Sequence, residues 1–243
     1  MNVVGIIPAR GGSKRLKDKN ILPIAGKPLI GYVIEDAMAA KSIDKVVVST
    51  DCEKISAVVR ENYPVEVIKR PAEFARDDSP IEEALLHAVE YLEKNGSYKA
   101  DIVVWMQANI PIKEAGLIDA VVNKLIESDA DSCVTVCEAE EFPEVMKAID
   151  EKGMLIPLFK DVDRIRCQEF PKRYRLDGSV LAMRAKNLFS TRGIRKAHIY
   201  LGNNIIPVIQ KKKMYSLEID TQDEFIMAEY YINRFYQQVK KVS

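Results

Sequence analysis

The chain has 243 residues, a length that allows one α/β domain with a sizeable core, or a larger domain that carries a smaller extension. Lysine plus arginine and aspartate plus glutamate number 36 each, so no net charge draws the protein to nucleic acid or to an anionic membrane. No apolar run approaches the ~20 residues that span a bilayer, and the sequence enters a strand without a signal-peptide pattern. We therefore expect a cytoplasmic protein with no nucleic-acid partner and no membrane partner.

The first predicted strand, residues 3–8, runs straight into a loop with two glycines and a cluster of basic side chains. The basic residues are Arg10, Lys14, Arg15, Lys17 and Lys19. Gly11 and Gly12 would let backbone N–H groups approach phosphate oxygens, Ser13 would add a hydroxyl, and the cations would neutralise the negative charges. The loop therefore predicts a polyphosphate site, and a solvated basic turn is the alternative.

The same region lacks the pattern of a Walker loop. Gly26-Lys27 has no glycine five residues upstream, and Pro28 follows it. The geometry of a lysine at the start of a helix, which phosphate-binding ATPases use, is therefore not expected.

Strand-like and helix-like segments alternate through the first half of the chain. Apolar runs at 3–8, 45–50, 65–68 and 101–106 alternate with segments of helical period at about 28–41, 53–62 and 80–95. This pattern predicts an α/β fold with a mostly parallel, Rossmann-like sheet and crossover helices. Ligands of such sheets bind at the carboxyl ends of the strands. The loops at those ends hold Arg10 to Lys19, Thr50-Asp51, Arg70 to Ser79 and Gln107 to Pro111, so we expect one site there.

The predicted helix at 80–95 has a favourable start. Ser79 is the expected cap, Pro80 suits the first turn, and Glu82-Glu83 would face the positive end of the helix dipole. The acids before it, Asp77 and Asp78, are typical both of a helix entry and of a turn that presents groups to a ligand. For Asp77 we favour a role in the ligand site, and for Asp78 we leave both interpretations open. Another helix is expected after Pro111, through residue 126.

The cysteines and histidines argue against two kinds of site. Four cysteines, at 52, 133, 137 and 167, lack the paired short spacings of a zinc site. The two histidines, His87 and His198, lack the context of a catalytic triad. Cys133 and Cys137 fall on one face of a predicted strand at 132–137, which suits core cysteines in a reducing compartment.

The regular alternation ends after residue 137. Segment 138–178 is charged, with short apolar pieces at 146–149 and 155–159, and its stretch 161–175 is dense in charge. These features are typical of an exposed arm that orders on a partner subunit or covers a site. A solvated loop is the alternative. We divide the chain into a core of residues 1–137, an extension of residues 138–178, and a return to the core at 179–243.

Late strands are predicted at 180–183, 205–209 and 215–219, before a final helix. Thr221 with Glu224 forms a capping-box pattern, followed by an apolar stripe of Phe225, Ala228, Tyr231, Ile232 and Phe235. Glu218 and Asp220 stand two residues apart on the predicted strand, hence on one face, where their oxygens could hold Mg²⁺. Taken alone, this spacing is a weak signal. The triplet Lys211 to Lys213 is interpreted as a solvated turn.

Several of these motifs carry a family resemblance. Ile-Pro-Ala-Arg-Gly-Gly-Ser-Lys at 7–14, with Lys19-Asn20 and Gly26-Lys27-Pro28-Leu29-Ile30, resembles the N-terminal signature of the acylneuraminate cytidylyltransferases. Further matches follow in the family's order at Ser49-Thr50-Asp51, Arg70-Pro71-Ala72-Glu73, Gln107 to Pro111, Arg175 to Gly178 and Ile219-Asp220-Thr221. Members of this family join CMP from CTP to a nine-carbon acidic sugar and release pyrophosphate. The CMP-KDO synthetases form a sister family that shares much of the first half.

The resemblance implies a nucleotidyltransferase sheet and assigns roles to individual residues. Arg10, Lys19 and Asp220 would be catalytic, with Asn20 and Arg70 near the cytosine. The expected nucleotide-binding set is Arg10, Gly11, Gly12, Ser13, Lys14, Lys19, Asn20, Arg70, Asp77 and Ser79. Mg²⁺ is the implied cofactor, held by Asp220 and by Glu218, where the family has an aspartate.

The resemblance also implies a sugar site and a homodimer. The expected sugar-binding residues are Gln107, Arg166, Arg175, Asp177 and Gly178, with Arg175 facing the substrate carboxylate and Arg166 beside Cys167, where the family often has arginine. Segment 138–178 would build the dimer interface. Asn109 stands where the CMP-KDO enzymes carry a metal-binding aspartate, which argues against KDO. Three alternatives stay open: a CMP-KDO-type synthetase, a pyrophosphorylase acting on a sugar 1-phosphate, and a non-catalytic nucleotide-binding module.

Overall fold

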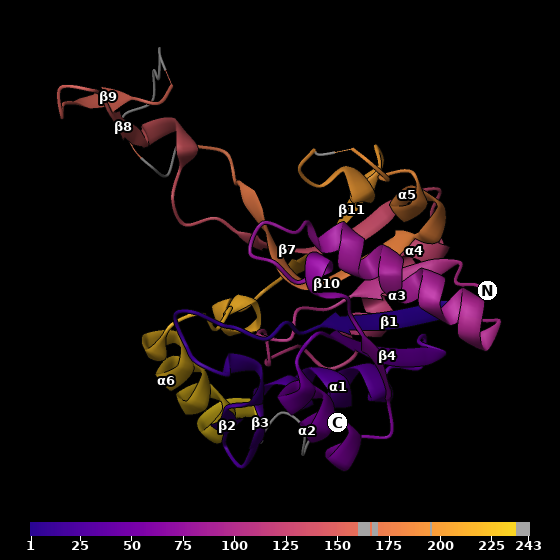
Figure 1. The fold of residues 1–243 in the computed structure, drawn as a ribbon. Coiled ribbons are helices and arrows are strands. Elements are labelled where there is room, and N and C mark those ends of the chain that lie inside the picture. Colours follow the sequence, from indigo (N-terminus) through magenta and orange to yellow (C-terminus); the bar gives the residue numbers. More distant parts are fainter. Residues whose placement is uncertain (160–165, 167–169, 195, 237–243) are drawn as a thin grey trace.

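The computed structural model describes residues 1–159, 166, 170–194 and 196–236 and shows a seven-stranded sheet with helices on both faces (Figure 1). Its strands are β1 (Val3–Pro8), β4 (Lys45–Thr50), β5 (Glu66–Lys69), β6 (Ile102–Trp105), β7 (Ser132–Glu138), β10 (Tyr174–Arg184) and β11 (Ile205–Gln210). Their order is β11-β7-β10-β6-β1-β4-β5. All four strands predicted in the first half are confirmed, because their apolar runs pair as neighbours in the centre and at one side of this sheet.

The sheet is mostly parallel, as predicted. β1 pairs in parallel with β4 and β6, β4 with β5, and β7 with β11. β10 runs antiparallel to both of its neighbours, β6 and β7. The chain leaves β1 toward β4 on one side and later returns through β6 on the other, so the strand order reverses beside β1, where open α/β sheets form a crevice.

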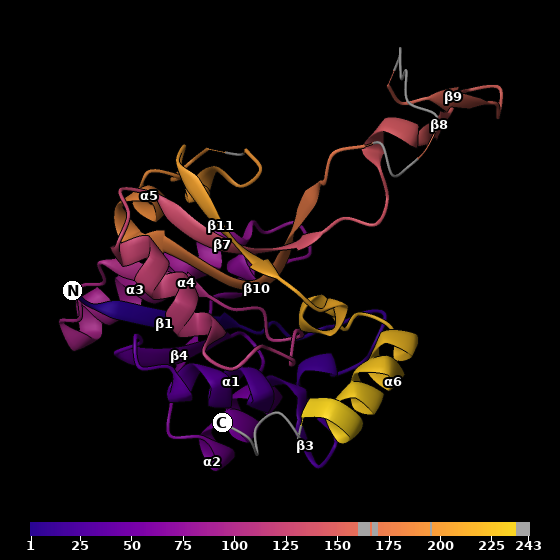
Figure 2. The ribbon, with the colours of Figure 1, turned by 180° about the vertical axis from the view of Figure 1, so that it is seen from behind.

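Helices cover the two faces of the sheet in separate layers (Figure 2). Helices α1 (Leu29–Ala39), α2 (Glu53–Asn62) and α4 (Leu117–Ile126) pack in one apolar cluster, and α3 (Ile81–Gly96) and α5 (Ala185–Phe189) pack in the other. Alternate residues of β1 divide between them, with Val3 and Ile7 in the first cluster and Val4 and Ile6 in the second. The predicted crossover helices are therefore confirmed.

A third, smaller cluster lies beside the main sheet and holds the end of the chain. It joins the hairpin of β2 (Pro23–Ile24) and β3 (Lys27–Pro28) to α6 (Gln222–Tyr231). The predicted capping box is confirmed, because Thr221 accepts from the Glu224 N–H and the Glu224 carboxylate accepts from the Thr221 N–H at 2.7 Å. Ala228 and Ile232 of the predicted stripe are buried, and a π-helical turn, Ile232–Tyr236, follows.

An arm projects from the body of the molecule and carries the hairpin of β8 (Lys147–Ile149) and β9 (Leu155–Pro157) (Figure 1). Its large apolar side chains are open to solvent: Val145, Met146, Ile149, Met154, Leu155, Ile156, Leu158 and Phe159. β10 begins at Tyr174 at the base of the arm and continues into the centre of the sheet, so the division that we set at residue 178 falls inside this strand.

Two local predictions were wrong. Residues 215–219 form no strand, because Lys213–Ser216 is a 3-10 helix (η6) and the Tyr215 carbonyl accepts from the Gln210 side chain instead of a neighbouring strand. Ser79 does not cap α3. Its hydroxyl donates to the Glu73 carbonyl at 2.7 Å and accepts from the Arg76 N–H, so it closes the preceding turn, and Pro80 occupies the cap position.

The cysteines agree with the structural reading of the sequence. Cys133 and Cys137 are buried on one face of β7, and Cys52 is half-buried; all three are free thiols, while Cys167 lies outside the described residues. None of the helices in the described ranges is long and apolar enough to cross a membrane.

Candidate active site

A cavity of about 500 Å³ opens at the carboxyl ends of β1, β5 and β6. Pro8 and Arg10 line it from the end of β1, Arg70 from the end of β5, and Trp105 from the end of β6. The predicted convergence of the loops at one edge is therefore confirmed. The cavity lies beside the point where the strand order reverses, which is where such sheets bind ligands.

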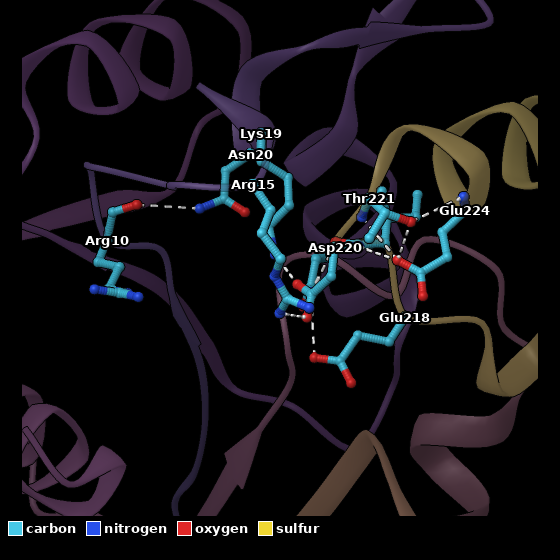
Figure 3. A network of polar contacts seen from close by, with 10 residues as sticks. Arg10, Arg15, Lys19, Asn20, Glu218, Asp220, Thr221 and Glu224 are labelled. Carbon is cyan, nitrogen blue, oxygen red and sulfur yellow. Dashed lines mark hydrogen bonds and ion pairs between the residues drawn. The ribbon is translucent and has the colours of Figure 1, made fainter. Parts of the chain in front are cut away.

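The basic loop reaches across this cavity to Asp220 (Figure 3). Lys19 Nζ lies 2.5 Å from one carboxylate oxygen of Asp220, and an Arg15 guanidinium nitrogen lies 2.5 Å from the other. The Lys19 side chain is only 15% exposed, whereas the Arg15 side chain is 68% exposed. Lys19 is therefore a fixed charge at the wall of the cavity, and Arg15 reaches in from solvent.

Asp220 is held in its ionised form by these neighbours. Partial burial acts to raise the pKa of its carboxyl, but the hydrogen bond and charge of Lys19, the charge of Arg15 and a hydrogen bond from Asn109 outweigh it, so the pKa is lowered. The carboxylate is thus negative across the physiological range, which is the form that can bind a metal ion.

Arg10 and Lys14 form a second charge group at the mouth of the cavity. Arg10 lies 2.5 Å from Asp77, and Lys14 contacts the other oxygen of the same carboxylate. The hydrogen bonds from Lys14 and Arg10 lower the Asp77 pKa to about 2. Asp77 does not line the cavity but forms ion pairs with two of the cations that do.

Asn20 and Arg70 are buried polar residues of the cavity wall. Asn20 donates to the Arg10 carbonyl at 3.3 Å, and Arg70 donates to the Ser49 carbonyl at 2.7 Å. Burial lowers the Arg70 pKa to about 10, and its Nε is buried without a hydrogen-bond partner. A buried donor without a partner is costly, so this nitrogen is an exception to the usual pairing of buried polar groups.

The glycines of the basic loop act differently from the prediction. The Gly11 N–H donates to Asp51 at 2.9 Å, which ties the loop to the end of β4. Gly12 has a left-handed φ of 69° and shapes the turn. Neither glycine lines the cavity, whereas Ser13 and Lys14 do, and Ser79 lies outside it. The loop therefore presents the side chains of Ser13 and Lys14 to the cavity, and the Gly11 amide is engaged by Asp51.

Glu218 and Asp220 are brought together by Asn109, although the strand expected to align them does not exist. The Asn109 amide donates at 3.2 Å to both carboxylates and also to the Ile219 carbonyl. The Ile219 N–H donates back to the Asn109 carbonyl at 2.9 Å. The loop after β6 therefore fixes the position of both acids.

The two carboxylates share one donor and are hard oxygen ligands of the type that would hold a magnesium ion. Mg²⁺ is usually held by one or two carboxylates, with phosphate oxygens and waters completing its octahedron. In the described part of the chain no cluster of three or more His, Cys, Asp or Glu side chains forms an all-protein cage. Asp220 and Glu218 would therefore hold the ion together with the substrate.

The predicted sugar residues are placed in three different environments. Gln107 lines the cavity. Gly178 packs against the Gln107 side chain, because a Cβ at this glycine would come 2.2 Å from the Gln107 side-chain nitrogen. Its φ of 74° lies in the left-handed region. Asp177 does not line the cavity: it is buried, and its carboxylate accepts hydrogen bonds from Thr135, Ser179, Gln210 and Ser216.

The remaining two sugar candidates lie away from the main cavity. Arg175 lines a second cavity of about 700 Å³ with Lys211 to Lys213 and Phe142. Arg166 is exposed on the arm. The structure therefore does not bring these arginines to Gln107 within one chain.

Sequence reasoning missed three contributors to the main cavity. Arg15 was counted in the basic cluster but not as a partner of Asp220. Trp105 ends β6 and lines the cavity, and Asn109 was weighed only as a poor metal ligand. The signal that could have found both was their place at the carboxyl end of a buried strand, Trp105 as its last residue and Asn109 in the loop that follows.

Three comparisons report what this chain resembles. The sequence pattern of the cytidylyltransferase family matches residues 4–240. The chain is 28% identical over 228 residues to an N-acylneuraminate cytidylyltransferase of Streptococcus agalactiae serotype III, covering 93% of this chain and 52% of that protein. It is also 28% identical over 231 residues to a CMP-N,N'-diacetyllegionaminic acid synthase of Legionella pneumophila, covering 94% of this chain and 95% of the relative.

The fold has a close counterpart among solved structures. A CMP:2-keto-3-deoxy-manno-octonic acid synthetase complexed with CTP superposes with a TM-score of 0.72 at 19% identity, covering 96% of this chain and 99% of the other. At this identity the likeness shows the fold alone. The chain spans about half the length of the streptococcal relative. The match over nearly all of its residues, with the fold and the motifs seen in the sequence, shows that the chain belongs to the cytidylyltransferase family.

Proposed function

We propose that the protein is a nucleotidyltransferase that joins CMP from CTP to a carboxylated ketose of the nine-carbon nonulosonic class and releases pyrophosphate. The observation that carries this proposal is a single cavity lined by the cations Arg10, Arg15 and Lys19 and by the acid Asp220, to which the Asn109 amide ties Glu218. A triphosphate and its metal ion need both kinds of charge in one site.

The reaction makes one bond and breaks one bond at the α-phosphorus. The oxygen of the anomeric hydroxyl bonds to the α-phosphorus and its proton passes to solvent, while the bond from the α-phosphorus to the bridging oxygen breaks and pyrophosphate leaves with that electron pair. Arg10 and Lys19 bind the departing phosphates, and the cavity wall holds the two reactants in line. Mg²⁺ would neutralise the phosphate oxygens when held by Asp220 and Glu218. Arg70 and Asn20 would recognise the cytosine edge from the buried wall.

A nonulosonic acid is the proposed acceptor. The names of the two relatives, an N-acylneuraminate cytidylyltransferase and a CMP-N,N'-diacetyllegionaminic acid synthase, support this class. Gln107 faces the cavity and would bind the sugar. Asn109 carries an amide where a carboxylate is expected in a CMP-KDO enzyme, and this amide donates to Glu218 and Asp220.

The direct test is pyrophosphate release from CTP and Mg²⁺ with a panel of nonulosonic acids, KDO and sugar 1-phosphates. We expect release with at least one nonulosonic acid and loss of release in Arg10→Ala. Release only with KDO or only with a sugar 1-phosphate would replace the proposed substrate. CTP binding without release from any acceptor would instead identify a non-catalytic nucleotide-binding module.

Gly178→Ala tests the sugar end of the cavity. The added methyl group would overlap Gln107, and the left-handed backbone would be strained, so Gln107 must move. We expect the KM for the sugar to rise by about tenfold, which matches the ~1 to 3 kcal/mol of one lost buried polar contact, while the KM for CTP changes little. Gly12→Ala provides the comparison, because it has a similar φ and open space around it. Equal effects on both substrates would contradict the placement of Gln107.

We further propose that the protein acts as a homodimer built through the arm. Eight large apolar side chains of residues 145–159 are exposed, a density that isolated surface side chains rarely reach. The partner's arm is then the source of residues, such as Arg166, that the main cavity lacks in one chain. Sedimentation at micromolar concentration should show a dimer, and the double substitution Ile149→Asp and Leu155→Asp should give a monomer. A wild-type monomer at high concentration would contradict the proposal.

The cytoplasm is the proposed location. The three described cysteines are free thiols, and two of them are buried in the core, which suits a reducing compartment.

A further inference from the structure

Asp177 is a buried carboxylate surrounded by neutral donors. It is 3% exposed. One oxygen accepts from the Thr135 hydroxyl at 2.5 Å and from the Ser179 N–H at 2.9 Å, and the other accepts from the Ser216 hydroxyl at 3.0 Å and from the Gln210 amide. Among the described residues it forms no ion pair. Burying a carboxylate without an ion pair is costly unless hydrogen bonds satisfy its oxygens. Hydrogen bonds to a carboxylate are strong, so they hold the four donors in place.

The four donors come from separate parts of the sheet edge. Thr135 is on β7, and its hydroxyl also bonds both backbone groups of Val180, which closes the irregular stretch of β10 between Leu176 and Leu181. Gln210 ends β11, and its amide also donates to the Tyr215 carbonyl at 3.1 Å. Ser216 belongs to the turn η6. One carboxylate therefore ties two strands and a turn to the bulge in β10.

The turn η6 leads directly into the residues that carry the acids of the cavity. Residues 217–220 have no helix or strand of their own to fix them. Their far end is held by the capping box, where the Asp220 N–H donates to Glu224 at 2.8 Å, and their middle by the bonds between Ile219 and Asn109. Their near end is held by Ser216 and Tyr215, through Asp177 and Gln210.

We propose that Asp177 is a positioning residue for the reaction: it anchors segment 216–220 and thereby fixes Glu218 and Asp220 in the cavity. The next residue, Gly178, packs against Gln107. Two consecutive residues therefore position different parts of the site: Asp177 positions the two acids, and Gly178 positions Gln107. What the anchored segment contributes to catalysis rests on the proposed function. That the segment is anchored through Asp177 does not.

The test compares Asp177→Asn with Ser179→Ala by hydrogen exchange of peptides that cover residues 213–221. The asparagine keeps the shape but puts an NH₂ against donors. Ser179→Ala is the matched control, because it is a neighbour in the same buried strand, it keeps its N–H to Asp177, and its own hydroxyl has no partner. We expect exchange at 216–220 to be at least tenfold faster in Asp177→Asn, with β1 unchanged, and to stay within twofold in Ser179→Ala.

Kinetics supply the second readout. Asp177→Asn should lower kcat by at least tenfold and raise the Mg²⁺ concentration for half-maximal rate, while the KM for CTP stays within threefold. Ser216→Ala leaves the Asp177 carboxylate in place but removes one of its hydrogen bonds. It should likewise lower kcat and raise the Mg²⁺ concentration for half-maximal rate, and it replaces Asp177→Asn in the test if that variant does not fold. Faster exchange spread equally over β1, or unchanged exchange at 216–220, would overturn the proposal. A wild-type protein that releases no pyrophosphate would refute the proposed function alone, because the exchange result stands without turnover.

Discussion

Lys19→Ala is expected to slow pyrophosphate release on the order of 10²–10³-fold, the loss seen when a single fixed donor to developing charge is removed. Lys19 is the least exposed cation in the ion pairs that line the cavity, and its Nζ is held 2.5 Å from Asp220. A fixed, partly desolvated cation stabilises the charge on departing pyrophosphate more than a mobile surface cation does. Initial rates at saturating CTP and sugar would measure the effect.

Lys17→Ala is the matched control for this variant. Lys17 belongs to the same basic loop, but it is exposed and does not line the cavity. Its removal changes the net charge of the loop equally, so it should leave kcat within about twofold, as expected for screened surface charge. Equal losses of kcat in the two variants would mean that the loop acts only through its overall charge. The fixed position of Lys19 would then make no contribution to the rate.

Asp220→Asn is expected to lower kcat by about 10³-fold, because Asp220 is a metal ligand in the proposed function and loss of such a ligand removes several kcal/mol of transition-state stabilisation. The same change should leave binding of metal-free CTP at least as tight, since it removes a negative charge beside the triphosphate and frees Lys19 and Arg15. Fluorescence of Trp105, the one tryptophan of the chain and a residue of the cavity wall, would report that binding. Weaker metal-free binding would show that Asp220 serves the nucleotide in another way.

Asp223→Asn controls for the loss of one acid near this point, because Asp223 is exposed in the first turn of α6. It should change kcat by less than twofold. Any loss of rate in this variant that approaches the loss in Asp220→Asn would assign the effect to the helix start and not to the cavity.

The lowered pKa of Asp220 also predicts how stability depends on pH. The folded pKa lies below the ordinary value near 3.9, so the ion pairs of Asp220 stabilise the protein above that ordinary value. This contribution is lost as the pH falls through the folded pKa. The difference in melting temperature between wild type and Asp220→Asn should therefore be constant from neutral pH to about pH 5 and shrink below it. A constant difference down to pH 3 would contradict the assignment.

Local sequence was enough to predict a structural element where the sequence pattern lies within the same few residues that form the element. The apolar runs that became β1, β4, β5 and β6 alternate with helical segments, and chain connectivity alone then brings their carboxyl ends to one edge. The capping box of Thr221 and Glu224 spans four residues and was equally readable. The cations of the basic loop were located for the same reason, because they follow a strand end directly.

Tertiary contacts decided the rest, since they join residues that are far apart in the chain. The spacing of Glu218 and Asp220 suggested a strand, but it is Asn109, more than a hundred residues away, that holds the two acids together. The sequence suggested Asp177 as a sugar ligand, but its carboxylate is buried and accepts hydrogen bonds from side chains of three other elements. Sequence thus determined which polar and charged residues follow the strand ends, and the fold determined which of their polar groups remain free of partners within the protein, because a buried donor or acceptor must first be satisfied there.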